Sequence, residues 1–121
     1  MIVGIGVDVV DLARFERALS RTPGLRDRLF APSEQVKDER PRPLRSLAGR
    51  FAAKEALMKA LGDTTGIRWH DMRVESTGDG DPGLMLSGAA AEIAGRRGVR
   101  TVHLSMSHDA GIAIAYVVAE S

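Results

Sequence analysis

The sequence contains no cysteine, so neither a disulfide framework nor a thiolate metal site is available to it. Aromatic residues are also scarce (three Phe, one Tyr and one Trp), so the core must rely on Val, Ile, Leu and Ala. No apolar run reaches the ~18 residues of a membrane span, and the first residues lack the basic segment of a secretory signal. These absences predict a cytoplasmic protein without a membrane segment.

The 121 residues fit one domain, residues 1–121, of ordinary globular composition, with 44% apolar and 27% charged residues. A domain of this size buries a modest fraction of its surface, so self-association would help to stabilise it. The net charge is only +1. We expect neither nucleic acid nor a membrane among the partners.

Helix and strand patterns alternate along the chain, and strand pairs dominate its second half. The predicted helices are 12–22, a short turn at 25–30, 44–61 and about 87–97, and the predicted strands are 2–10, 72–76, 84–86, 99–107 and 112–119. Gly4 and Gly6 indicate a bulge or a close backbone approach in the first strand. Residues 31–43 are expected to form a polar connection. The pattern favours the α+β class, with an antiparallel β-sheet packed on the long central helix 44–61.

The first helix carries a basic stripe, with Arg14, Arg17 and Arg21 at positions i, i+3 and i+7 behind a predicted cap at Asp11. Such a stripe is typical of a docking surface for an acidic partner. It is equally typical of a solvated helix face.

Charged residues interrupt the otherwise apolar helix 44–61. Lys54 falls within an apolar stripe, and Glu55 and Lys59 lie one turn apart at its edge. They form either a solvated ion pair worth a few tenths of a kcal/mol or a site for metal and phosphate. Asp8, after an apolar strand segment, either starts the turn into the next helix or binds a cation.

The penultimate predicted strand carries a row of polar residues. Alternation places His103, Ser105 and Ser107 on one of its faces, and His108 lies at the turn that follows. This row is either the exposed face of a sheet or a contact surface for a polyanion. A catalytic triad of Ser107, His108 and Asp109 is excluded because adjacent strand residues point to opposite faces.

Three segments together carry a family resemblance: residues 5–12 (IGVDVVDL), 47–62 (LAGRFAAKEALMKALG) and 103–109 (HLSMSHD), with 30–34 (FAPSE) as a looser fourth. In order and spacing they resemble the bacterial holo-acyl-carrier-protein synthase family of 4′-phosphopantetheinyl transferases. The resemblance covers nearly the whole chain. It departs at Asp63-Thr64-Thr65-Gly66, where the family often has a short Thr-Gly loop, and at Asp81 before Pro82.

The resemblance implies the 4′-phosphopantetheinyl transferase fold and a trimer with active sites between protomers. It implies Mg²⁺-dependent transfer of 4′-phosphopantetheine from coenzyme A to a serine of an apo acyl carrier protein, which supports fatty acid biosynthesis. Adenosine 3′,5′-bisphosphate is the second product. Asp8 and Glu55 would ligate Mg²⁺, Lys59 would stabilise the leaving phosphate, and Glu55 or a metal-bound water would accept the serine proton.

The resemblance also implies two binding surfaces. Coenzyme A would be held by a nucleotide pocket lined by Ser105, Ser107 and His108 and by phosphate contacts from Arg50, Lys54 and His103. The stripe of Arg14, Arg17 and Arg21 would meet an acidic helix of the carrier protein.

Two other classes account for part of the pattern. Ribonuclease-H-like nucleases also open on Ile-Gly-Val-Asp, but they need further late acids on a longer chain, and Asp109 alone is a poor supply. A non-enzymatic docking domain explains the arginines of residues 14–28 but not Lys54 and Glu55 in an apolar helix.

Overall fold

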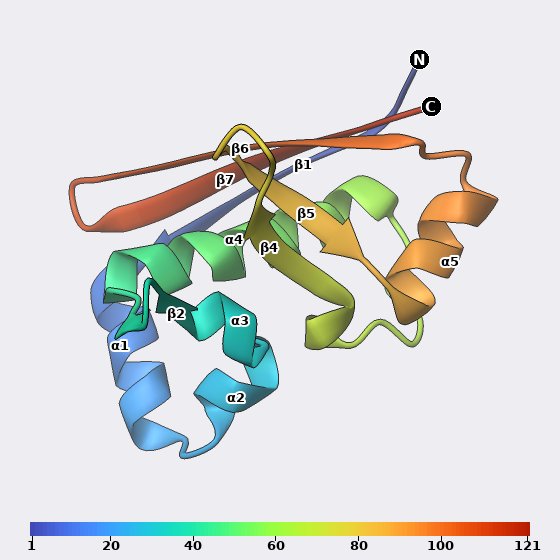
Figure 1. The fold of residues 1–121 in the computed structure, drawn as a ribbon. Helices are drawn as coiled ribbons and strands as arrows, with labels where there is room; N and C mark the ends of the chain where they lie inside the picture. Colours follow the sequence, from blue (N-terminus) through green and yellow to red (C-terminus); the bar gives the residue numbers. More distant parts are fainter.

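The computed structural model describes all 121 residues and confirms the α+β class (Figure 1). The helical elements are α1 (Leu12–Arg21), α2 (Leu25–Leu29), α3 (Pro32–Gln35), α4 (Leu44–Leu61), the 3₁₀ turn η1 (Trp69–Asp71) and α5 (Gly88–Arg96). The strands are β1 (Ile2–Asp11), β2 (Val36–Lys37), β3 (Arg40–Pro41), β4 (Met72–Ser76), β5 (Pro82–Leu86), β6 (Thr101–Asp109) and β7 (Ile112–Glu120). No helix combines the length and apolar character needed to cross a membrane.

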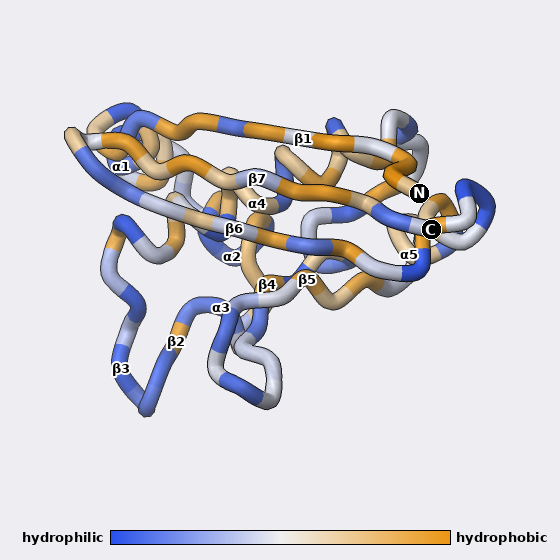
Figure 2. Tube along the Cα trace, turned by 90° about the horizontal axis from the view of Figure 1, so that it is seen from above, coloured by the Kyte–Doolittle hydropathy of each residue, from blue (hydrophilic) through white to orange (hydrophobic).

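A three-stranded antiparallel sheet in the order β1-β7-β6 forms one layer, with α4 packed against its inner face (Figure 1). Helices α1 to α3 gather at one end of α4, whereas β4, β5 and α5 cover the other end. The two chain termini lie side by side because β1 and β7 pair along their whole length (Figure 2). The predicted packing of an antiparallel sheet on helix 44–61 is therefore confirmed.

Small residues bring β1 and α4 into direct backbone contact. A Cβ on Gly6 would lie 2.7 Å from the carbonyl carbon of Ala56, and one on Gly4 would lie 2.9 Å from that of Ala60. The pairing of β1 with β7 also shifts register between Ile2 and Gly4. Both features predicted from these glycines, the bulge and the close approach, are present. The contact sets the distance between the end of β1 and the middle of α4, where the candidate site lies.

The segment 31–43 is more regular than expected from its sequence. It contains the short helix α3 and the β2–β3 hairpin, whose turn residues Asp38 and Glu39 have φ angles of 52° and 64°. Aspartate adopts this left-handed conformation more readily than most residues, whereas glutamate has no such preference. The sequence predicted only a polar connection here and missed these short elements, because they carry no hydrophobic periodicity.

The outer face of the three-stranded sheet is apolar and uncovered along β1 and β7. Ile5, Val7 and Val9 are 60%, 38% and 54% exposed, and Tyr116 is 52% exposed. The register places these side chains in adjacent rows, with Val7 opposite Tyr116. We call this surface the open sheet face.

Candidate active site

Two carboxylates and one ammonium meet where β1 passes α4. Asp8 pairs in register with Ala115, which is buried against α4, so its side chain faces Glu55 and Lys59 on that helix. Lys59 Nζ donates to Asp8 Oδ1 at 3.1 Å and to the Val7 carbonyl at 2.9 Å. Lys59 thus pairs with Asp8 across the two elements rather than with Glu55 along its own helix.

The Glu55 carboxyl is half-buried and lacks a matching cation. Burial and then the Asp8 carboxylate raise its pKa, and Lys59 only partly opposes them. Asp8 and Glu55 line one cavity of about 450 Å³, together with Arg14, Arg28, Phe51 and Trp69. We call it the carboxylate cavity.

The carboxylate pair offers the oxygen ligands of a magnesium site, and it offers too few of them to surround a metal ion with protein ligands alone. Nowhere in the structure do three or more His, Cys, Asp or Glu side chains cluster as a metal site. Mg²⁺ is typically bound by one or two carboxylates and fills its remaining positions with water and substrate phosphate. Asp8 and Glu55 therefore fit this cation.

A second, basic cavity of about 760 Å³ lies between the start of α4, the β2–β3 hairpin and the end of β6. Among the residues predicted to bind coenzyme A, Arg50, Ser107 and His108 line it. The basic residues that the sequence analysis missed are Lys37, Arg40, Arg42 and Arg45. Their clustering between residues 37 and 45 was the available signal, and it was set aside with the polar connection.

The arginines of this basic cavity are short of partners. Arg50 is only 6% exposed, and its Nη1 donates to Ser46 Oγ at 2.8 Å. The Nε atoms of Arg42 and Arg50 are both buried without an acceptor. Burial and then the neighbouring Arg42 guanidinium lower the pKa of Arg50 to about 10. Two adjacent guanidinium groups with unused donors form a receptor for an anion such as phosphate.

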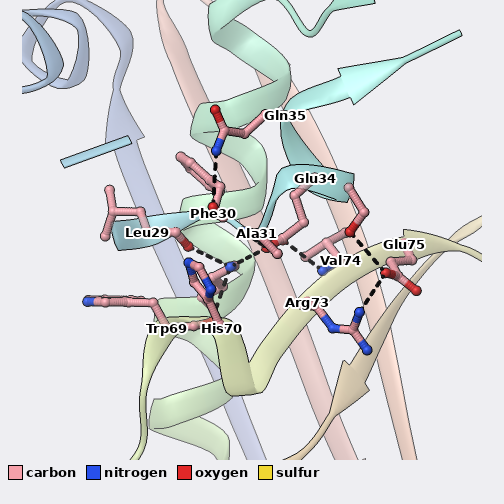
Figure 3. Close-up of polar contacts among 12 residues, drawn as sticks. Leu29, Phe30, Ala31, Glu34, Gln35, Trp69, His70, Arg73, Val74 and Glu75 are labelled. Atoms are coloured by element: carbon pink, nitrogen blue, oxygen red, sulfur yellow. Dashed lines mark hydrogen bonds and ion pairs between the residues drawn. The ribbon is translucent and has the colours of Figure 1, made fainter. Parts of the chain in front are cut away.

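Lys54 does not contact either cavity, so its prediction as a phosphate contact was wrong. Its side chain is fully buried, and Nζ donates to Glu34 Oε1 and to the Leu29 carbonyl, each at 2.7 Å, and to the Trp69 carbonyl at 3.2 Å (Figure 3). Each helical residue is rotated by about 100° from the last, so adjacent Lys54 and Glu55 face different surroundings.

His103 and Ser105 lie on the open sheet face, away from Asp8. The His103 Nε2 atom is 3.0 Å from Glu120 Oε1, and Ser105 pairs in register with Tyr116. The alternation predicted for β6 is present, but the chain does not bring these two residues to Asp8. Strands β1 and β6 are opposite edges of the sheet, about 10 Å apart for a strand spacing of 4.8 Å.

The three arginines of the predicted docking stripe are exposed on α1 and form no ion pair within the chain. Asp11 caps this helix as predicted, accepting from the Ala13 backbone N–H at 3.0 Å. Arg14 lines the carboxylate cavity, and Arg28 of α2 joins it there. A basic surface therefore borders the carboxylate pair.

Comparison with known proteins shows the family of the chain. A family model of the 4′-phosphopantetheinyl transferase superfamily matches residues 4–117. A holo-[acyl-carrier-protein] synthase of Clavibacter sepedonicus is 61% identical over 99% of this chain and 97% of its own length. The corresponding enzyme of Leifsonia xyli is 57% identical over 99% of this chain and 98% of its own length.

Solved structures of such enzymes share the fold. The holo-[acyl-carrier-protein] synthase of Neisseria meningitidis superposes with a TM-score of 0.86 at 35% identity over the whole of both chains. The Helicobacter pylori enzyme in complex with coenzyme A has a TM-score of 0.79 at 35% identity, over 96% of this chain and 99% of the other. The nuclease and the non-enzymatic docking domain are thereby set aside. The chain belongs to the holo-[acyl-carrier-protein] synthase family of phosphopantetheinyl transferases.

Proposed function

We propose that this chain transfers 4′-phosphopantetheine from coenzyme A to a serine of an apo acyl carrier protein, in an Mg²⁺-dependent reaction. The observation that carries the proposal is that two carboxylates, Asp8 and Glu55, line one cavity, with the Lys59 ammonium bonded to Asp8 beside them. Family membership supplies the reaction class, and the Helicobacter pylori relative is a coenzyme A complex.

Asp8, Glu55 and the neighbouring Lys59 have separate chemical roles. Asp8 and Glu55 would hold Mg²⁺, which when bound neutralises charge on the pyrophosphate oxygens of the donor. The Lys59 side chain is 55% exposed, so its ammonium, besides its bond to Asp8, can reach the phosphate that leaves as adenosine 3′,5′-bisphosphate. Glu55, with its raised pKa, is the better proton acceptor of the two for the attacking serine hydroxyl.

The basic cavity is proposed to bind the nucleotide of coenzyme A. Arg50 and the neighbouring Arg42 supply unused donors for phosphate oxygens, and Ser107 and His108 line the same cavity. The nucleotide carries a separate phosphomonoester besides its pyrophosphate, which suits a site with several guanidinium groups.

A homotrimer with sites between protomers is proposed for the assembly. The open sheet face exposes Val7, Val9 and Tyr116, and burying such apolar side chains is favourable at about 25 cal/mol per Å². His103 and Ser105 lie on this same face, where a neighbouring protomer would pack. They would then act in the neighbour's site, and this explains why one chain holds them apart from Asp8.

The carrier protein is proposed to dock on α1. Arg14, Arg17 and Arg21 are unpaired in the chain, so an acidic helix would gain ion pairs without breaking existing ones. Arg14 lies at the carboxylate cavity, which would direct the carrier serine to Glu55. Support of fatty acid biosynthesis in the cytoplasm remains a prediction from the sequence.

The deciding experiment incubates the protein with coenzyme A, Mg²⁺ and apo carrier proteins and measures the carrier mass. A gain of one phosphopantetheine is expected, and it should disappear with EDTA. Asp8→Asn and Glu55→Gln should each abolish it, whereas Glu92→Gln, an exposed acid on α5, serves as the matched control and should not. Absence of the mass gain with several carriers would refute the proposal, and substantial activity in either acidic variant would refute the metal assignment.

A further inference from the structure

A buried ion pair, Lys54 with Glu34, lies beneath the wall of the carboxylate cavity. Both side chains have zero exposure, and their Nζ and Oε1 atoms are 2.7 Å apart. Burying two charges costs several kcal/mol per ion and is seldom the most stable choice for a core. The pair therefore calls for an explanation beyond stability.

The ammonium of Lys54 is shared among three segments of the chain. Besides Glu34 of α3, it binds the carbonyl of Leu29 at the end of α2 and the carbonyl of Trp69 in η1 (Figure 3). Leu29 and Trp69 are separated by 40 positions, yet one nitrogen from α4 ties both main chains. Apolar side chains could fill this space, but they could not hold two carbonyl groups.

The two tied residues are parts of the cavity wall. Leu29 and Trp69 both line the carboxylate cavity, and Trp69 packs on Phe51 with ring centroids 5.5 Å apart. Arg28, next to Leu29, lines the same cavity as Glu55. The helix residue that precedes Glu55 thus fixes the wall that Glu55 faces.

Glu34 secures the other side of the connection. Its Oε1 accepts from the Ala31 N–H at 2.9 Å, and its Oε2 accepts from the Val74 N–H of β4 at 3.0 Å (Figure 3). The carboxylate thereby anchors α3 to β4, while the ammonium anchors α2 and η1 to α4. The two charges have separable tasks.

We propose that Lys54 is a positioning residue that holds α2 and η1 as a fixed wall of the carboxylate cavity. This wall would align the serine of a docked carrier protein with Glu55. This inference deepens the proposed function and rests on it for the identity of the docked partner. The wall borders the carrier surface through Arg14 and Arg28, whereas the basic cavity around Arg50 lies elsewhere.

The test compares Lys54→Met, Glu34→Gln and the double variant with the wild type. Both single changes break the ion pair, but only the loss of Lys54 frees the Leu29 and Trp69 carbonyls. We expect Lys54→Met and the double variant to raise the carrier KM by roughly tenfold, because misplacement of about 1 Å has effects of this order or larger. The coenzyme A KM should not change, and Glu34→Gln should keep the wild-type carrier KM.

A control and a second readout separate positioning from folding. Arg73→Met with Glu75→Gln removes a half-buried ion pair on neighbouring β4 and should leave both KM values unchanged. Trp69 is the only tryptophan, so acrylamide quenching of its fluorescence reports the wall without any substrate. Quenching should increase in Lys54→Met and the double variant only.

The proposal would be overturned if Lys54→Met and the double variant kept the carrier KM and the Trp69 quenching of the wild type. It would also be overturned if Glu34→Gln raised the carrier KM as much as Lys54→Met does. If the wild type modifies no carrier, the proposed function fails, while Trp69 quenching still decides whether Lys54 holds the wall. If the Lys54 variants do not fold, amide hydrogen exchange in the wild type tests whether Lys54 holds the cavity wall. The amides of residues 28–30 should exchange as slowly as those of α4, and rapid local exchange there would refute the proposal.

Discussion

Replacing Gly6 with alanine should separate the two halves of the carboxylate site. The added Cβ would lie 2.7 Å from the Ala56 carbonyl carbon and 3.0 Å from the Ala60 nitrogen, whereas relaxed carbon contacts are about 3.5 Å. Both neighbours are backbone, so β1 must retreat from α4 by about 1 Å. Overpacking of this kind costs about 1–3 kcal/mol, and we expect the upper end because no side chain can yield. The Tm should fall by about 10 °C.

The same retreat moves Asp8, two residues further along β1, away from Glu55. A misplacement of about 1 Å in a catalytic constellation can cost about 100-fold in rate. Gly95→Ala is the matched control, since its Cβ would meet nothing within 4 Å and the change should slightly stabilise α5. Thermal unfolding and carrier modification measure both effects. A Gly6→Ala variant with unchanged Tm and full activity would refute the argument that this contact sets the site.

Three further predictions concern the charges and the open sheet face. In EDTA, Glu55→Gln should be more stable than the wild type only above about pH 4.5, the ordinary pKa of a glutamate. Burial and Asp8 raise the pKa of Glu55 in the folded protein, so the protonated form favours folding, and the wild type loses this stabilisation as pH rises through the folded-state pKa. Equal stability of the two proteins at pH 7 in urea unfolding would contradict this. Arg50→Met should weaken coenzyme A binding by roughly 10–100-fold in calorimetry, as expected for one charge-assisted contact, and unchanged affinity would exclude the basic cavity as the nucleotide site. Val7→Glu should give monomers by light scattering and lose carrier modification, because it places an unpaired charge in the apolar proposed interface; an intact trimer would place the interface elsewhere.

The elements that the sequence predicted best are those with a strong hydrophobic period. Helix 44–61 was predicted with the bounds of α4, and the strands at both ends of the chain were within two residues of those in the structure. The β2–β3 hairpin was missed because two-residue strands carry no period, and its basic residues Lys37, Arg40 and Arg42, which line the basic cavity, were missed with it.

Lys54 marks the limit of reasoning from residue type. The family resemblance implied a phosphate contact for Lys54, and residue type alone does not distinguish that role from a buried one. The distinguishing partner, Glu34, is 20 positions away and depends on how α3 folds back on α4. Periodicity did place Lys54 within an apolar stripe, and taking that stripe as evidence for burial would have predicted its position correctly.

The open sheet face shows why one chain is an incomplete description of the site. Periodicity placed His103 and Ser105 on one face of β6, and the register then sets them on the face opposite Asp8. No rotamer change can bring them across a sheet whose inner side is filled by Ala115 and Val117. If they bind the donor, they must do so for another copy of the chain, and the apolar side chains beside them provide the surface for that contact. Assembly and coenzyme A recognition should therefore be lost together in Val7→Glu, although Val7 itself touches no substrate.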